Sequence, residues 1–183
     1  MSGELKLILA ELEESLNYLS EKSIDQLTDT ILNSNRIIVV GVGRVMISLK
    51  AWVKRMTHLG IDINYLGSET EGVIDKNDLV IIGSSSGESL IPKVIAKKAK
   101  SVGARTYYIG CTEKSSVDRL TDQHLILTGR TKFNSPSDFD SKQPMSTLFE
   151  QQLYLLGDAI SLKIMSVKNM EENDVKKHHA NLE

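Results

Sequence analysis

The stretch Asp78–Ser89, DLVIIGSSSGES, contains the end of a strand, a loop and the start of a helix. Its unbroken apolar run, Leu79–Ile82, is typical of a buried strand in a parallel sheet. The run leads directly into the glycine- and serine-rich segment Gly83–Glu88. From Ser89 to Gly103 the apolar residues recur at helical spacing. The segment is therefore expected to join the carboxyl end of a strand to the amino end of a helix.

This serine loop has the chemistry of an anion-binding site. The first backbone N–H groups of a helix have no partner within the helix and carry partial positive charge. Ser84, Ser85 and Ser86 add hydroxyl donors that occupy little space. A phosphate is the anion that this arrangement favours. Serine and glycine are also common in turns and helix caps, so an ordinary turn is the alternative.

Composition limits the class of protein. A chain of 183 residues is expected to form one domain. The chain has 22 Lys and Arg residues and 24 Asp and Glu residues, which gives a net charge of −2. This balance does not indicate a basic surface for binding nucleic acid. We find no signal-peptide pattern and no apolar run near the roughly 18 residues of a membrane span. The single cysteine, Cys111, fits a reducing compartment, and we expect a cytoplasmic protein.

The rest of the chain alternates between strand and helix patterns. Helices are expected within residues 3–33, an α/β core over 36–168 and a tail over 169–183. The second helix has capping-box spacing at Ser23-Ile-Asp-Gln26, which predicts its start. Core strands are expected at 36–40, 61–66, 79–82, 106–109 and 124–127, and further helices at 45–59 and 147–167. This alternation predicts a parallel α/β sheet with crossover helices on both faces.

A second glycine-containing loop, Gly41-Val-Gly43-Arg44, follows the first strand. Dinucleotide-binding proteins have a third glycine where this chain has Met46, which argues against a nucleotide cofactor. Arg44 is expected at the carboxyl edge of the sheet, where a guanidinium can bind a phosphate or an enolate oxygen. An ion pair with Glu69 or Glu71 is the alternative for Arg44.

Glu150 and two histidines are the remaining candidates for acid–base chemistry. Glu150 is either a general base or the last residue of a capping box that begins at Thr147. His179 either moves protons in the cleft of a neighbouring subunit or belongs to a solvated tail. His58 is either functional or a partner of its helix C-terminus. Adjacent His178 and His179 point apart and have no further ligands nearby in sequence, so no metal site is predicted.

Taken together, these segments resemble the sugar isomerase (SIS) domain family, and most closely its small stand-alone members, the 6-phospho-3-hexuloisomerases. The resemblance runs from about Leu5 to Glu183. The motifs that carry it are Gly41–Arg44, Arg55–Gly60, Asp78–Ser89, Gln143–Glu150 and His178–Glu183.

The resemblance implies a three-layer α-β-α sandwich with a five-stranded parallel sheet, a homotetramer, and neither metal nor organic cofactor. It also implies a sugar phosphate as substrate, with no nucleic acid or membrane partner. The family's phosphate-binding residues map to Ser84, Ser86, Gly87 and Ser89. Its enediol-forming base maps to Glu150, and its other catalytic groups map to Arg44, His58 and, from a neighbouring subunit, His179. Substrate-facing loops map to Gly43, Ser68 and Glu69.

The expected reaction interconverts D-arabino-hex-3-ulose 6-phosphate and fructose 6-phosphate through a cis-enediol. The sequence departs from the family pattern at Val45-Met46, where Ser-Gly is usual, at Ser85, where glycine is usual, and in the loop 67–72. These departures leave two alternatives, an isomerase for another sugar phosphate and a phosphosugar-binding sensor. The roughly 35 residues before the first strand are too few and too acidic for the helix-turn-helix domain that such regulators carry.

Overall fold

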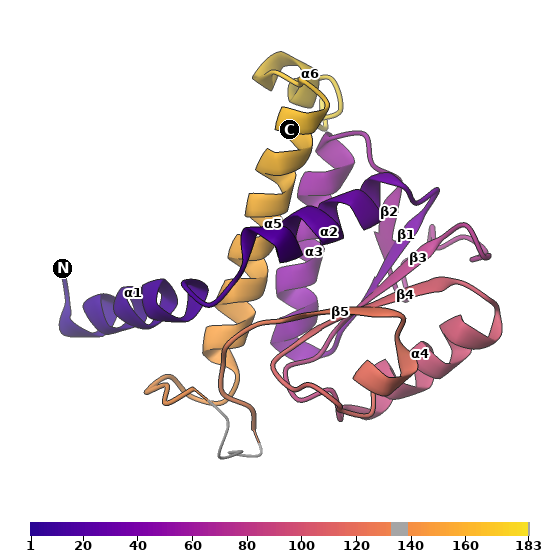
Figure 1. Cartoon of the computed structure of the whole chain (residues 1–183). Helices are drawn as coiled ribbons and strands as arrows, with labels where there is room; N and C mark the ends of the chain where they lie inside the picture. The colour runs from indigo at the N-terminus through magenta and orange to yellow at the C-terminus, as the bar shows by residue number, and fades with distance from the viewer. Residues whose placement is uncertain (133–138, 183) are drawn as a thin grey trace.

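A computed structural model describes residues 1–132 and 139–182, and Figure 1 shows its sheet and helices. Residues 133–138 of the expected core and Glu183 of the expected tail lie outside the described residues. The sheet has five strands in the order β2-β1-β3-β4-β5, and all neighbouring pairs are parallel. The strands are β1 (Ile37–Val40), β2 (Ile63–Tyr65), β3 (Leu79–Gly83), β4 (Arg105–Gly110) and β5 (Gln123–Ile126).

Helices cover both faces of this sheet, which confirms the predicted three-layer α/β fold. They are α1 (Gly3–Leu16), α2 (Glu21–Leu32), α3 (Gly43–His58), α4 (Leu90–Ser101), α5 (Thr147–Val167) and α6 (Glu172–Lys176), with a short 3-10 helix η1 (Asp118–Leu120). In Figure 1, α2, α3 and α5 lie on one side of the sheet, α4 lies on the other, and α1 extends away from the body. In the part of the chain that the structure describes, no helix is long and apolar enough to cross a membrane.

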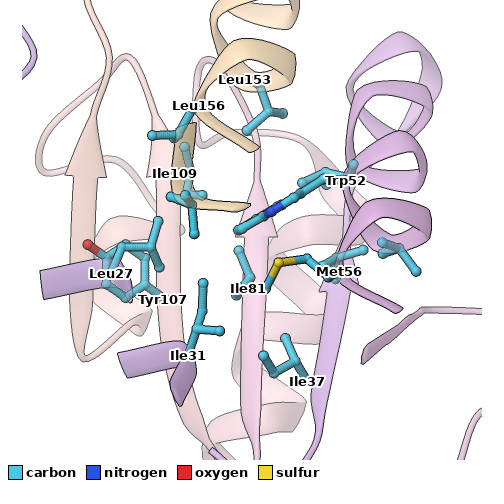
Figure 2. Close-up of a cluster of buried hydrophobic side chains, with 14 of the residues drawn as sticks. Leu27, Ile31, Ile37, Trp52, Met56, Ile81, Tyr107, Ile109, Leu153 and Leu156 are labelled. Carbon is cyan, nitrogen blue, oxygen red and sulfur yellow. The ribbon is translucent and has the colours of Figure 1, made fainter. Parts of the chain in front are cut away.

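The hydrophobic core is divided by the sheet into two clusters. Successive side chains of a strand point to opposite faces. Ile37 and Val39 of β1 accordingly join the larger cluster, whereas Ile38 and Val40 join the smaller one under α4. Figure 2 shows the larger cluster, in which Trp52 lies among residues of the strands, α2 and α5. Both faces are buried, which explains why the strands are apolar runs in the sequence.

Two helix starts test the sequence predictions. The predicted helix 147–167 coincides with α5. The predicted start of α2 is wrong, because Ser20 rather than Ser23 is its N-cap. The Ser20 hydroxyl oxygen accepts a hydrogen bond from the Ser23 backbone N–H at 3.2 Å.

The topology determines where a ligand can reach the loops. The chain passes from β1 through α3 to β2 at one edge, and then returns to place β3 on the other side of β1. The connections after β1 and β3 therefore diverge at their carboxyl ends, which is where open α/β sheets bind ligands. The serine loop and the loop Gly41–Arg44 both leave the sheet at this point.

Candidate functional site

The serine loop is fastened to β4 and the residues that follow it. The Ser84 backbone N–H donates to the Ile109 carbonyl at 3.0 Å, and the Cys111 N–H donates to the Ser85 carbonyl at 2.8 Å. The Tyr108 hydroxyl donates to the Ser84 carbonyl at 2.9 Å. Burial raises the pKa of the Tyr108 phenol above its ordinary value, so this donor stays protonated. The loop is thus held in one shape before any ligand binds.

Gly87 is required by the shape of this loop. Its φ is +64°, in the left-handed region that favours glycine. A Cβ there would overlap the Ser115 Oγ and lie 2.8 Å from the Tyr108 hydroxyl. Ser85, which stands where the SIS family usually has glycine, does not have a positive φ. Serine at this position therefore costs no backbone strain. The Ser85 hydroxyl donates to the Arg130 carbonyl at 3.3 Å.

A cavity of about 150 Å³ opens over the serine loop. Ser84, Ser85, Ser86 and Ser89 form one part of its wall, and the Ser84 hydroxyl is buried without a hydrogen-bond partner in the described structure. A buried polar group without a partner is costly, so this hydroxyl is suited to a ligand. The other lining residues are Val42, Val45, Gly83, Lys132, Ser146 and Glu150.

Glu150 lies in the first turn of α5 with 7 % of its surface exposed. One carboxylate oxygen accepts a hydrogen bond from the Ser146 hydroxyl at 3.0 Å, and the other accepts one from the Arg44 Nε. The Ser48 hydroxyl donates to the Glu150 carbonyl at 2.9 Å, which attaches α3 to α5. The predicted capping box is wrong, because Ser146 occupies the N-cap position and the Thr147 hydroxyl donates to the Pro144 carbonyl.

The alternative considered for Arg44, an ion pair with Glu69 or Glu71, is wrong. Arg44 forms its ion pair with Glu150. The Glu71 carboxylate instead accepts a hydrogen bond from the Gly67 N–H at 2.6 Å, within the loop after β2. Arg44 and Glu150 together line a second, more apolar cavity of about 310 Å³. Glu150 lines both cavities and therefore marks the boundary between them.

Three predicted substrate-loop residues lie outside the walls of these two cavities. Gly43 begins α3 with a φ of +57° and has open space where a side chain would be. Ser68 and Glu69 follow β2, and the Ser68 hydroxyl lies 3.1 Å from that of Thr70. They belong to the same carboxyl edge of the sheet but do not line the serine-loop cavity.

His58 and His179 come together at the far end of α3. Their ring centroids are 4.8 Å apart, and the neighbouring His178 lies against Gly60. A helix rises about 1.5 Å per residue, so His58 lies roughly 20 Å along α3 from Arg44. Within one chain the two histidines therefore do not reach the cavity that contains Glu150. Among residues 1–132 and 139–182, no three His, Cys, Asp or Glu side chains form a metal-binding group.

Sequence reasoning missed Lys132 and Ser146 as cavity residues. Lys132 follows β5. Its position after the carboxyl end of a parallel strand was a usable signal. Ser146 lies inside the segment Gln143–Glu150, but its contact with Glu150 depends on where α5 begins.

Comparisons with known proteins agree with this fold. The SIS domain family model matches residues 30–153. The 3-hexulose-6-phosphate isomerase of Bacillus subtilis is 37 % identical over 176 residues, covering 96 % of this chain and 95 % of the relative. A solved protein from Methanococcus jannaschii, for which a 3-hexulose-6-phosphate isomerase function was inferred, superposes with a TM-score of 0.83 at 26 % identity over the full length of both chains. A solved Escherichia coli protein, 17 % identical with a TM-score of 0.77 over 98 % of this chain and 100 % of its own, has the same fold. The chain belongs to the SIS domain family.

Proposed function

We propose that this isomerase interconverts D-arabino-hex-3-ulose 6-phosphate and fructose 6-phosphate. The observation that carries the proposal is the position of Glu150, whose buried carboxylate lines the cavity formed by the serine loop. A ketose phosphate isomerase needs a base at a fixed distance from the group that binds the substrate phosphate. A carboxylate beside an anion-binding loop meets this requirement. The curated relatives named 3-hexulose-6-phosphate isomerase support this choice of substrate.

In the proposed mechanism Glu150 takes the proton from C2 of the 3-ketose. The electron pair forms the C2–C3 double bond of a cis-enediol, and the C3 carbonyl oxygen takes a proton from His179 of a neighbouring subunit to become a hydroxyl. Glu150 then returns its proton to C3 while His179 accepts the proton that leaves the C2 hydroxyl, which produces the C2 ketone of fructose 6-phosphate. No electron acceptor is needed, because one carbon is oxidised as its neighbour is reduced.

The phosphate is held at a distance from the reacting carbons. Ser84, Ser86 and Ser89 donate to its oxygens, and Gly87 allows the loop backbone to approach closely. This binding energy, from a part of the substrate that does not react, positions C2 and C3 against Glu150. Arg44 stabilises the negative charge that develops on the enediolate oxygen.

The two histidines enter this proposal through a homotetramer of single-domain subunits. His179 of a neighbouring subunit transfers the hydroxyl proton, and His58, which contacts His179 within its own chain, supports it there. Gly43, the first residue of α3, and Ser68 and Glu69, in the loop after β2, lie at the same edge of the sheet and contact the open end of the sugar. The exposed apolar side chains of α3 and α5, Ile47, Tyr154, Leu155 and Leu162, offer surface for the subunit contacts.

A different sugar phosphate is the second candidate, and Val45 is the observation that favours it. Val45 lines the serine-loop cavity where the family pattern has a serine hydroxyl. The cavity therefore offers one donor fewer and one apolar surface more to the ligand.

Proton NMR of fructose 6-phosphate with the purified protein in heavy water tests the proposal. Loss of the C3 proton signal with appearance of a 3-ulose phosphate is the expected result. Exchange at C1 instead identifies an aldose–ketose isomerase. Binding without product, measured as a thermal shift with the same sugar phosphate, identifies a sensor and contradicts the proposal. Product formation decides between these outcomes, because a shielded proton transfer can hide the exchange.

A further inference from the structure

The serine-loop cavity has few charges with which to balance a phosphate. A phosphate monoester carries a charge of about −1.5 to −2 at neutral pH. The hydroxyls and backbone N–H groups of the loop are neutral donors, and Glu150 adds a negative charge to the wall. Arg44, the cation that pairs with Glu150, lines the second cavity instead. Among the described residues that line the serine-loop cavity, Lys132 is the one cation.

The segment that carries Lys132 is attached to the serine loop and to α5. The Arg130 carbonyl accepts the hydrogen bond from the Ser85 hydroxyl at 3.3 Å. The Arg130 guanidinium donates to the Ser141 carbonyl, also at 3.3 Å. Two residues earlier, the Gln152 side chain of α5 donates to the Thr128 carbonyl at 2.6 Å. These bonds fix the chain at Thr128 and Arg130, just before Lys132, so the fold brings Lys132 to the wall of the cavity.

We propose that Lys132 binds the substrate phosphate and is the residue that makes the cavity select phosphorylated over unphosphorylated sugars. The inference rests on the proposed function, because it takes the serine loop as the phosphate anchor. A lysine ammonium is a compact charge at the end of a flexible four-carbon stem. It can therefore approach a phosphate already seated on the loop hydroxyls. Its charge also offsets the repulsion between the phosphate and Glu150.

Titration calorimetry of Lys132→Met with fructose 6-phosphate and with inorganic phosphate tests this role. Hydrogen bonds to charged groups are worth enough for the affinity of both ligands to fall about 10- to 100-fold. The affinity of the unchanged protein should fall as salt is added, and that of Lys132→Met should depend on salt much less. Lys132→Arg retains the charge and should recover most of the affinity. In turnover assays KM should rise, with kcat changed far less.

Lys142→Met is the matched control, since Lys142 is also exposed and also lies between β5 and α5 but does not line this cavity. Its affinities should equal those of the unchanged protein. Ser84→Ala separates the two proposals. If Ser84→Ala weakens phosphate binding and Lys132→Met does not, the role of Lys132 is wrong and the phosphate loop stands. A fall in kcat at unchanged affinity likewise overturns a phosphate-binding role. If the unchanged protein binds neither ligand, the proposed function fails, and the Lys132 inference fails with it.

Discussion

The Arg44 guanidinium and the Glu150 carboxylate form an ion pair across 106 residues of sequence. It joins the first turn of α3 to the first turn of α5. The two side chains differ sharply in exposure, at 66 % for Arg44 and 8 % for Glu150. A buried carboxylate needs its partners more than an exposed guanidinium does. The pair therefore holds the Glu150 side chain in an enclosed position at the boundary of the two cavities.

Replacing Glu150 with Gln tests its role as the base. We expect isomerisation to fall about 10²-fold or more while fructose 6-phosphate affinity is retained, because the amide keeps the shape and loses the proton acceptor. Steady-state kinetics and titration calorimetry measure the two quantities. Asp29→Asn, on the exposed side of α2, is the control and should leave both unchanged. Near wild-type turnover of Glu150→Gln would remove Glu150 from the mechanism.

Replacing Arg44 with Met tests whether its charge stabilises the enediolate. Loss of one donor to a developing oxyanion lowers kcat about 10²-fold or more in comparable sites, and we expect a fall of that order here. Because Arg44 and Glu150 are in direct contact, the double variant Arg44→Met/Glu150→Gln should lose much less than the product of the two single losses. Independent, multiplying losses in this cycle would show that the two residues do not act together.

The sequence predicted the elements of this fold well, because their signals are local. The apolar stripe of 147–167 predicted α5 to the residue, since a buried helix face repeats with the helical period. The start of α2 was misplaced because Ser20 and Ser23 both suit an N-cap. The backbone conformation at each serine determines which of the two caps the helix, and the sequence pattern does not contain that information.

The candidate site was predicted less completely, because its contacts are long-range. The serine loop was recognised from one continuous segment, and the structure places it beside Glu150. The partner of Arg44 was not predictable, since Glu69, Glu71 and Glu150 are equally acidic and only the packing of α3 against α5 selects among them. Lys132 was missed for the same reason, because its place at the cavity depends on how the chain runs after β5.

Gly87→Ala should destabilise the protein severely. A non-glycine residue at positive φ costs on the order of 1 kcal/mol, and here the added Cβ also overlaps the Ser115 side chain and the Tyr108 hydroxyl. We expect a total loss of about 3 kcal/mol or more in the free energy of unfolding. Gly67→Ala is the control for conformation alone, since Gly67 has a φ of +83° with no atom within 4 Å of the added Cβ. Denaturant unfolding that gives equal losses for both variants would show that the loop can move away from the clash.

A buried carboxylate also connects α1 to the segment that leads into α5. Glu11 is 6 % exposed and accepts hydrogen bonds from the Ser141 hydroxyl and the Lys142 N–H, both at 2.7 Å, and from the Gln143 side chain at 3.1 Å. Burial raises the pKa of the Glu11 carboxyl, but these hydrogen bonds together hold it below its ordinary value. Glu11 is therefore a charged anchor for the chain just before Ser146.

Glu11→Gln should lose this anchor, because the amide presents its own donors to three donor groups. At pH 7 we expect a loss of about 1–3 kcal/mol in the free energy of unfolding. A carboxyl whose pKa is lowered by folding stabilises the protein fully above its ordinary pKa of 4.5. That stabilisation is lost as the pH falls through the lower pKa of the folded state. The difference between the unchanged protein and Glu11→Gln should accordingly be largest near neutral pH and shrink below about pH 4.5. Denaturant unfolding from pH 7 to pH 3 measures it, with Glu14→Gln on the exposed side of α1 as the control. A difference that stays constant across this range would mean that the loss comes from the donors of the introduced amide and that the charge of Glu11 contributes nothing.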